Sequence, residues 1–247
     1  MALYFFFGGL ATVGVGLTSA FKIRKIAYDG KRAMLDERAK ALAGRVGSGR
    51  DRLVVIADFD RTLSRYRTSI GAPVTTSHGV VENCEILDET YRKKAQDLAE
   101  FYIPREFDTS LSDKDRTKVC EEWWSKAHDL LMEYGLTRQQ LEDAVKSEKN
   151  LELREGCEEM FQMLEKNDVP LLIFSAGLGD VIETFLRTKI FGRTGKIPSN
   201  IHIISNRMRF QNNRLVGFED EIIHSCNKGL TPMRELQAKG VFKNRTT

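Results

Sequence analysis

The chain has 247 residues, which is enough for one good-sized hydrophobic core with an inserted module. Charged residues make up 30% of the sequence, but the formal net charge is only +3, so bulk electrostatics gives no case for nucleic-acid binding. The cysteines are scattered and form no C-x-x-C pair, which argues against a disulfide framework or a zinc site and fits a reducing compartment. They are Cys84, Cys120, Cys157 and Cys226.

The N-terminal segment differs from the rest of the sequence. Residues 2–21 carry no charge and would span about 30 Å as a helix, just long enough to cross a bilayer. Basic residues follow from Lys22 on, so the positive-inside tendency would keep the remainder of the chain on the cytosolic side. A cleaved signal peptide, with Thr18 and Ala20 before the cut, and a nonspanning tail are the alternatives. We expect residues 1–21 to form a membrane anchor or a targeting segment.

A basic linker over residues 22–50 leads into the run LVVIADFDRTLSR, which predicts a strand that ends in two aspartates. Alternate residues at a strand end point the same way, so Asp58 and Asp60 can aim two carboxylates at one point. Two such charges need a cation between them, or one must stay protonated. Both conditions suit phosphoryl transfer with Mg²⁺, in which one carboxylate attacks phosphorus and the other handles a proton. A polar turn without a function is the alternative, because aspartate is common in turns.

Residues 66–154 have mainly helical periodicity, including an aromatic stripe around Trp123 that we expect to lie partly in the core. Strands and helices alternate again after that segment: VPLLIFSAG and IHIISN read as strands, with a helix between them. This order predicts an open, largely parallel α/β sheet built from residues 51–65 and 155–247, with residues 66–154 inserted as a helical cap.

Small residues end the strand VPLLIFSAG at Ser175, Ala176 and Gly177. They let backbone N–H groups approach an anion, and the hydroxyl of Ser175 adds a donor beside the helix that starts near Asp180. A tight strand-to-helix turn without a ligand is the alternative. A dinucleotide fingerprint is excluded because Ile182 occupies the third glycine position.

A lysine after the segment GFEDEIIHSCNK completes the motifs. Near a phosphate-binding strand end, Lys228 can neutralise phosphoryl oxygens as a point charge, although a lone lysine is most often a solvated surface residue. The sequence has no G-x-x-x-x-G-K-[ST] motif, which excludes a P-loop. An EF-hand loop that starts at Asp58 is excluded because Leu63 and Ser69 stand where glycine and glutamate are needed.

The motifs DFDRTLSR, FSAG and NK, in this order around a helical insert, resemble the haloacid dehalogenase superfamily. The segments TSHGVVENCEIL, EEWWSKAHDLL, IFSAGLGDVIE and GFEDEIIHSCNK are similar to the pyrimidine 5′-nucleotidase family, which includes the 7-methylguanosine-phosphate-specific enzymes. The resemblance covers about residues 53–228. It implies a haloacid dehalogenase-like Rossmannoid fold with a helical cap, and a phosphoric monoester hydrolase that needs Mg²⁺. It also implies a cytoplasmic enzyme, which we expect to be a monomer.

The same resemblance implies roles for individual residues. Asp58 would be the nucleophile that forms an aspartyl-phosphate, and Asp60 the general acid and base. The carboxylate of Asp58 and the backbone carbonyl of Asp60 would bind Mg²⁺. Ser175, the N–H of Ala176, and Lys228 would hold the phosphate.

Two further residues would contact the base of the nucleotide. Glu106 matches a base-reading position, and its carboxylate suits an exocyclic amine such as that of cytosine or guanine. Trp124 matches a stacking position, and tryptophan is the best partner for a cationic ring such as 7-methylguanine. The sequence therefore favours 7-methyl-GMP weakly and leaves CMP and UMP open.

One motif of the family is missing. The family pattern has a strand ending in GD-x-x-x-D downstream of the lysine, whereas the only acidic residue after Lys228 is Glu235. We therefore expect either a Mg²⁺-dependent 5′-nucleotidase or a shortened, weak or inactive relative that binds only a nucleotide or a partner.

Overall fold

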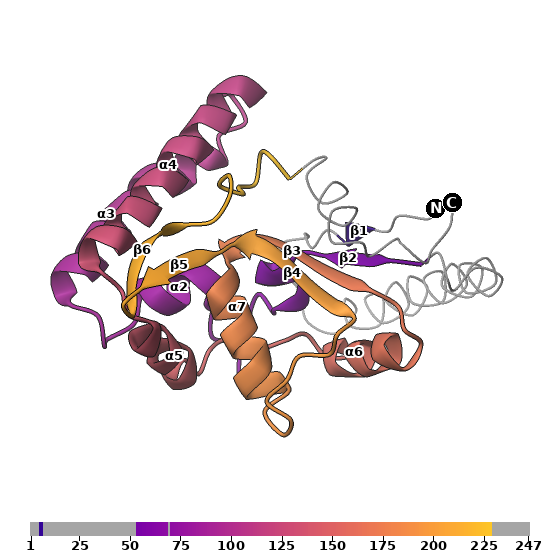
Figure 1. The fold of residues 1–247 in the computed structure, drawn as a ribbon. Coiled ribbons are helices and arrows are strands. Elements are labelled where there is room, and N and C mark those ends of the chain that lie inside the picture. Colours follow the sequence, from indigo (N-terminus) through magenta and orange to yellow (C-terminus); the bar gives the residue numbers. More distant parts are fainter. Residues whose placement is uncertain (1–4, 7–52, 69, 229–247) are drawn as a thin grey trace, which may run out of the picture.

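A parallel sheet forms the centre of the fold in the computed structural model, which describes residues 5–6, 53–68 and 70–228 (Figure 1). Its strands lie in the order β1-β2-β3-β4, and each neighbouring pair is parallel. They are β1 (Phe5–Phe6), β2 (Val55–Ala57), β3 (Leu171–Leu178) and β4 (Ile201–Asn206). Almost every residue of β3 and β4 is buried, so these strands read as continuous apolar runs in the sequence.

Alternate strand residues divide between two hydrophobic clusters, because successive side chains point to opposite faces of the sheet. Leu171 and Ile173 belong to the larger cluster, which also contains the apolar side of the helices. Leu172 and Phe174 belong to a small cluster on the opposite face. Helix α6 (Cys157–Lys166) comes directly before β3, and α7 (Gly179–Phe185) directly after it. Helix α7 continues into the wider turns of η3 (Leu186–Ile190).

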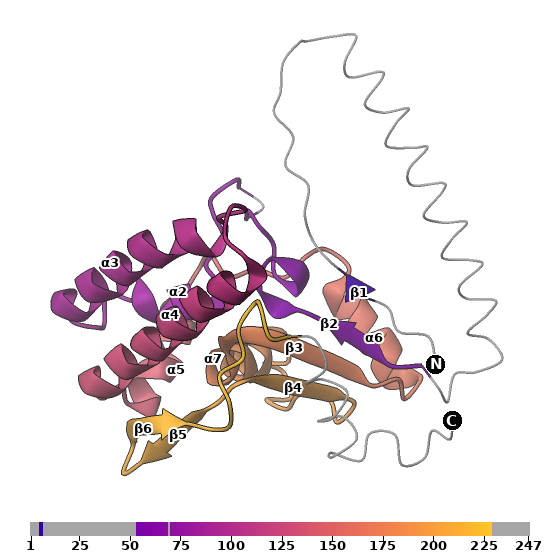
Figure 2. The ribbon, with the colours of Figure 1, turned by 90° about the horizontal axis from the view of Figure 1, so that it is seen from above.

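The chain between β2 and β3 is mainly helical. It begins with the irregular turn η2 (Phe59–Leu63) and contains α2 (Ser77–Glu82), α3 (Glu89–Glu106), α4 (Asp113–Tyr134) and α5 (Arg138–Ser147). Each of these four helices begins after a side chain that accepts a hydrogen bond from a backbone N–H of the first turn, as preferred N-cap residues do. The cap residues are Thr76, Asp88, Ser112 and Thr137. The long helices α3 and α4 lie side by side, away from the sheet (Figures 1 and 2).

A hairpin of β5 (Met208–Gln211) and β6 (Arg214–Phe218) follows β4. Asn212 and Asn213 both adopt positive φ, which a two-residue hairpin turn requires and which asparagine tolerates. The hairpin packs against α4, where the rings of Phe218 and His128 stack with their centroids 3.7 Å apart. A bridge between Thr137 and Arg214 ties the hairpin to the start of α5.

The predicted parallel α/β sheet with a helical insert is confirmed, whereas the predicted transmembrane segment is wrong. Phe5 and Phe6 form a strand beside β2. Within residues 5–6, 53–68 and 70–228, no helix is both long and apolar enough to cross a membrane. The rest of the predicted anchor, the basic linker over residues 22–50 and the chain after Lys228 lie outside the described residues.

Candidate active site

The first predicted residues of the site meet where β2 ends. Asp58 directly follows the strand, and its Oδ1 accepts a hydrogen bond from the N–H of Phe59 at 2.9 Å. The Nζ of Lys228 lies 2.8 Å from the same Oδ1, although the two residues are 170 positions apart in the chain. The side chain of Asp58 is 37% exposed, so this carboxylate remains accessible to a ligand. The fold therefore brings the first and third motifs together.

The turn η2 holds Asp58 and Asp60 in place. Arg61 adopts a φ of 62°, in the left-handed region, and its N–H donates to the Oγ of Ser64 at 2.8 Å. Arg154, which comes just before α6, donates to the carbonyl oxygens of Thr62 and Arg61 at 2.8 and 2.7 Å. These contacts hold a strained backbone conformation directly beside two functional candidates, a location where such strain is often found.

Asp60 is held by Ser77, the first residue of α2. The N–H of Ser77 donates to Oδ1 at 2.8 Å, and its hydroxyl donates to Oδ2 at 2.6 Å. The pKa of Asp60 is raised to about 6, chiefly by burial and to a lesser extent by the negative charge of Asp58, against the lowering effects of Ser77 and Lys228. A carboxyl group with this pKa can both give and take a proton near neutral pH.

Sequence reasoning gave no role to Ser77. Its hydroxyl also accepts a hydrogen bond from the N–H of Leu178 at 3.3 Å, so one side chain joins η2, α2 and the end of β3. The available signal was the pair Thr76-Ser77 before Gly79, because Thr76 caps the helix and places Ser77 in its first turn. That signal predicts a helix start but does not identify which side chain the serine contacts.

The second motif forms the last part of β3, where the pairing with β4 shifts register between Phe174 and Leu178. The Oγ of Ser175 is buried and accepts a hydrogen bond from the N–H of Gly177 at 3.0 Å. Two β4 side chains hold the backbone: Asn206 donates to the carbonyl of Ala176 at 2.7 Å, and Ser205 donates to the carbonyl of Gly177 at 2.6 Å. This irregular strand segment is therefore held by side chains as well as by the sheet.

Only glycine fits at position 177. A Cβ atom there would lie 1.9 Å from the Oγ of Ser77 and 2.9 Å from the Oδ2 of Asp60. The close approach of this backbone to Asp60 is the physical reason for the small residue in the FSAG motif.

The two residues predicted to contact a base lie on the helices of the insert. Glu106 ends α3, and its Oε1 accepts a 2.6 Å hydrogen bond from the hydroxyl of Ser225, three residues before Lys228. Trp124 on α4 contacts two other rings: Trp123 at 5.0 Å and nearly parallel, and His78 at 4.4 Å and tilted. The indole of Trp124 therefore belongs to a cluster of protein rings.

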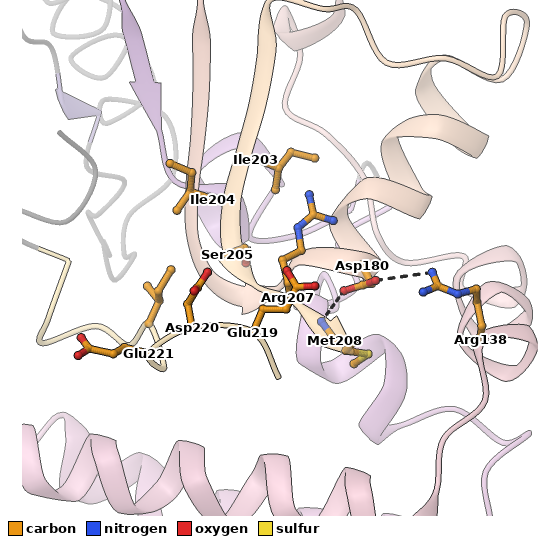
Figure 3. A pocket seen from close by; sticks show the side chains of 11 residues that line it. Arg138, Asp180, Ile203, Ile204, Ser205, Arg207, Met208, Glu219, Asp220 and Glu221 are labelled. Carbon is orange, nitrogen blue, oxygen red and sulfur yellow. Dashed lines mark hydrogen bonds and ion pairs between the residues drawn. The ribbon is translucent and has the colours of Figure 1, made fainter. Parts of the chain in front are cut away.

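A separate hollow lies beside the hairpin at the end of β4 (Figure 3). In it, Asp180 accepts a hydrogen bond from the N–H of Met208 at 2.8 Å and lies 3.8 Å from a guanidinium nitrogen of Arg138. Burial raises the pKa of Asp180. None of the residues predicted from the motifs lines this hollow. The candidate active site therefore stays at Asp58 and Asp60, where the predicted residues meet.

Comparison with known proteins agrees with the motifs. The family described as pyrimidine 5′-nucleotidase (UMPH-1) matches residues 61–247, about three quarters of the chain. The chain belongs to this family. The 7-methylguanosine phosphate-specific 5′-nucleotidase of Homo sapiens is 40% identical over 73% of this chain and 58% of its own length. The corresponding protein A of Xenopus laevis is 35% identical over 80% of this chain and 66% of its own length. The chain thus spans about three fifths to two thirds of these relatives.

A solved structure extends the agreement to the fold. Cytosolic 5′-nucleotidase IIIB bound to cytidine has a TM-score of 0.60 and 28% sequence identity, covering 75% of this chain and 60% of that protein. A relative from Caenorhabditis elegans also has "cytosolic 5′-nucleotidase 3" in its name. The predicted family is confirmed, and the predicted parallel α/β sheet with a helical insert agrees with this solved structure. The names of these relatives, like the described helices, conflict with the transmembrane prediction.

Proposed function

We propose that the chain is a Mg²⁺-dependent 5′-nucleotidase that hydrolyses nucleoside 5′-monophosphates. The observation that carries the proposal is the convergence at the end of β2, where Lys228 lies 2.8 Å from Asp58 and Ser77 holds both carboxylate oxygens of Asp60. Membership of a pyrimidine 5′-nucleotidase family supports the same substrate class.

In this proposal Asp58 is the nucleophile. One carboxylate oxygen forms a bond to phosphorus while the bond from phosphorus to the 5′-oxygen of the nucleoside breaks. Lys228 already pairs with this carboxylate and would then offset the charge on the phosphoryl oxygens. The partial exposure of Asp58 leaves room for the phosphate to reach it.

Asp60 supplies the proton transfers. In the first step it donates its proton to the leaving 5′-oxygen, which its raised pKa permits near neutral pH. In the second step it removes a proton from the water that attacks the aspartyl-phosphate, which releases phosphate and restores Asp58. Ser77 fixes the carboxyl group in one orientation for both steps.

The donor set at this end of the sheet fits Mg²⁺. The partly exposed carboxylate of Asp58 and the backbone carbonyl of Asp60 are hard oxygen ligands, and Mg²⁺ in proteins usually keeps several waters and needs few carboxylates. When bound, the ion would stabilise negative charge on the phosphoryl group. Asp58 and Asp60 are therefore the proposed metal ligands.

Phosphate binding is assigned to the irregular last part of β3 together with Lys228. The Ser175 hydroxyl and the N–H of Ala176 belong to a strand segment that Asn206 and Ser205 hold by hydrogen bonds. A segment that is already held in place costs little ordering entropy when an anion binds.

The base is assigned to the insert, with α3 and α4 acting as a cap over the sheet. Glu106 contacts Ser225, in the segment that carries Lys228, which supports a role in which its carboxylate accepts a hydrogen bond from an exocyclic amine. A base that stacks on Trp124 would join the rings of Trp123 and His78, which already contact the indole. We propose 7-methyl-GMP and the pyrimidine nucleotides CMP and UMP as the substrates to compare.

The test is phosphate release by the full chain with Mg²⁺ and, separately, CMP, UMP and 7-methyl-GMP. Asp58→Asn keeps the size of the side chain but removes the nucleophile, so turnover should fall to the background level while urea unfolding shows a folded protein. Removing Mg²⁺ with EDTA should also stop turnover of the wild-type chain. Folded wild-type protein that binds a nucleotide without releasing phosphate would contradict the enzymatic proposal and leave nucleotide binding as the function.

A further inference from the structure

Three soft donor groups meet beside the segment that carries Lys228. Cys120 lies fully buried on α4, and its sulfur is 3.3 Å from the sulfur of Cys226, 106 residues later. His224 is also buried, and one ligand atom each from Cys120, His224 and Cys226 lie within 4.8 Å of one another. No nucleotidase role described above uses these side chains.

Their surroundings favour a cation. The carboxylate of Glu106 accepts a hydrogen bond from Ser225, whose hydroxyl lies 3.4 Å from the sulfur of Cys120. The Ser225 hydroxyl, which also lies 3.8 Å from the sulfur of Cys226, thus links this carboxylate to both sulfurs. A metal ion would displace the thiol protons on binding and would offset the resulting thiolate charge beside the carboxylate.

We propose that Cys120, His224 and Cys226 bind a thiophilic divalent cation such as Zn²⁺, with water as the fourth ligand. Zn–S distances of about 2.3 Å and Zn–N distances of about 2.0 Å place tetrahedral donors roughly 3.5 to 3.8 Å apart. The donor atoms here lie within about 1 Å of that arrangement, so side-chain rotation is enough to complete it.

A route to the site exists. A surface cavity is lined by Glu106, Ser225 and Cys226, together with residues from the first turns of α4, and Cys226 is exposed. An ion could reach the sulfur of Cys226 first and then Cys120 behind it.

The site is distinct from the proposed Mg²⁺ site in chemistry. Sulfur and imidazole donors select zinc-like ions, whereas Asp58 and Asp60 offer only oxygen. A disulfide between the two cysteines would use the same sulfurs, but it would give no role to the imidazole of His224. The convergence of three donor groups therefore favours a metal ion over a disulfide bond.

Binding would have a structural consequence. The ion would connect α4 of the insert to residues 224–226, two positions before Lys228, and so fix the backbone from which Lys228 reaches Asp58. Occupancy would therefore couple the insert to the phosphate-binding lysine.

Cobalt titration of the reduced full chain tests the proposal. Co²⁺ adopts zinc sites and shows sulfur-to-metal charge-transfer absorption when thiolates bind it. We expect one equivalent to bind with this absorption, and Zn²⁺ to displace it. Cys226→Ser, a change at an exposed position, should weaken binding by at least about tenfold, and His224→Asn by a similar factor.

Two control variants make the result specific. Cys84→Ser alters another free cysteine and should leave the absorption unchanged. Asp58→Asn should also leave it unchanged, so the outcome does not depend on the proposed nucleotidase. Wild-type protein without thiolate absorption, or absorption that survives in Cys226→Ser at unchanged affinity, would overturn the proposal. Cys120→Ser should also weaken Co²⁺ binding. If that variant unfolds because Cys120 is buried, Cys226→Ser at the exposed position still tests whether thiolates bind the ion.

Discussion

Replacing Asp60 by asparagine should make the protein more stable while removing its activity. Burial raises the pKa of this carboxyl from 3.8 to about 6, so ionising it in the folded state costs about 3 kcal/mol at pH values above 6. Asparagine avoids this cost, but it cannot accept the hydrogen bond that the Ser77 hydroxyl donates, which removes about 1 kcal/mol. The net gain in the free energy of unfolding is about 2 kcal/mol at pH 7.5. This is an upper value, because Asp60 keeps some contact with solvent, which lowers the cost of ionising it.

The sign of the pH dependence identifies the cause. Asp60 ionises near pH 3.8 in the unfolded chain but only near pH 6 in the folded protein. The folded state of the wild type therefore loses stability as the pH rises from 3.8 through 6. The difference between Asp60→Asn and the wild type should therefore shrink by about 1 kcal/mol when the pH is lowered from 7.5 to 5.

Urea unfolding in EDTA, followed by tryptophan fluorescence at both pH values, measures this difference. Asp97→Asn, at an exposed position on α3, controls for the loss of one negative charge. Mg²⁺ should reduce the difference at pH 7.5, because the cation favours the ionised carboxylate. A difference that is the same at pH 5 and 7.5 would refute the assignment of a buried, raised-pKa carboxyl at Asp60.

Other changes probe the same packing and charges. Gly177→Ala should lower the free energy of unfolding by about 1–3 kcal/mol in urea, because the new Cβ lies 1.9 Å from the Ser77 hydroxyl. The loss should be smaller in a Ser77→Ala background, and equal stability of Gly177→Ala and wild type would contradict this reasoning. His128→Phe should raise the free energy of unfolding by about 2 kcal/mol at pH 5 and by less at pH 8. Burial lowers the pKa of His128 to about 4, so the wild type loses stability as the pH falls below 6.5, and parallel unfolding profiles would exclude this cause. Lys228→Met should lower kcat/KM by about 10²-fold or more, whereas Lys166→Met, at the exposed end of α6, should not.

The predicted elements and the main motifs follow from local patterns. The apolar run before Asp58 and the run that leads into Ser175 predict strands: Asp58 directly follows β2, and Ser175 lies in the second half of β3, which continues to Leu178. Lys228 comes after the β5–β6 hairpin and not directly after a strand of the parallel sheet, so its contact with Asp58 could not be predicted from strand order. The family resemblance added the roles of individual residues, which no periodicity encodes.

The missed features depend on contacts between distant segments. Ser77 reaches Asp60 only because α2 packs against the end of β3, and no spacing in the sequence expresses that. The proximity of Cys120 and Cys226 was missed for the same reason: 106 residues separate them, so rules based on C-x-x-C spacing argued against a metal site. The transmembrane prediction relied on the absence of charge in residues 2–21, a signal that an apolar strand such as β1 also satisfies.

The hairpin β5–β6 has a mechanical consequence for the insert. The insert is joined to the sheet covalently at its two ends. The stack of Phe218 on His128 adds a third attachment, which comes from the hairpin that follows β4. The bridge from Arg214 to Thr137 reinforces it. A hinge that swung the insert open as one piece would have to break this attachment. Nucleotides are therefore expected to enter by local movement near Ser225 and Lys228, with the helices staying where they are.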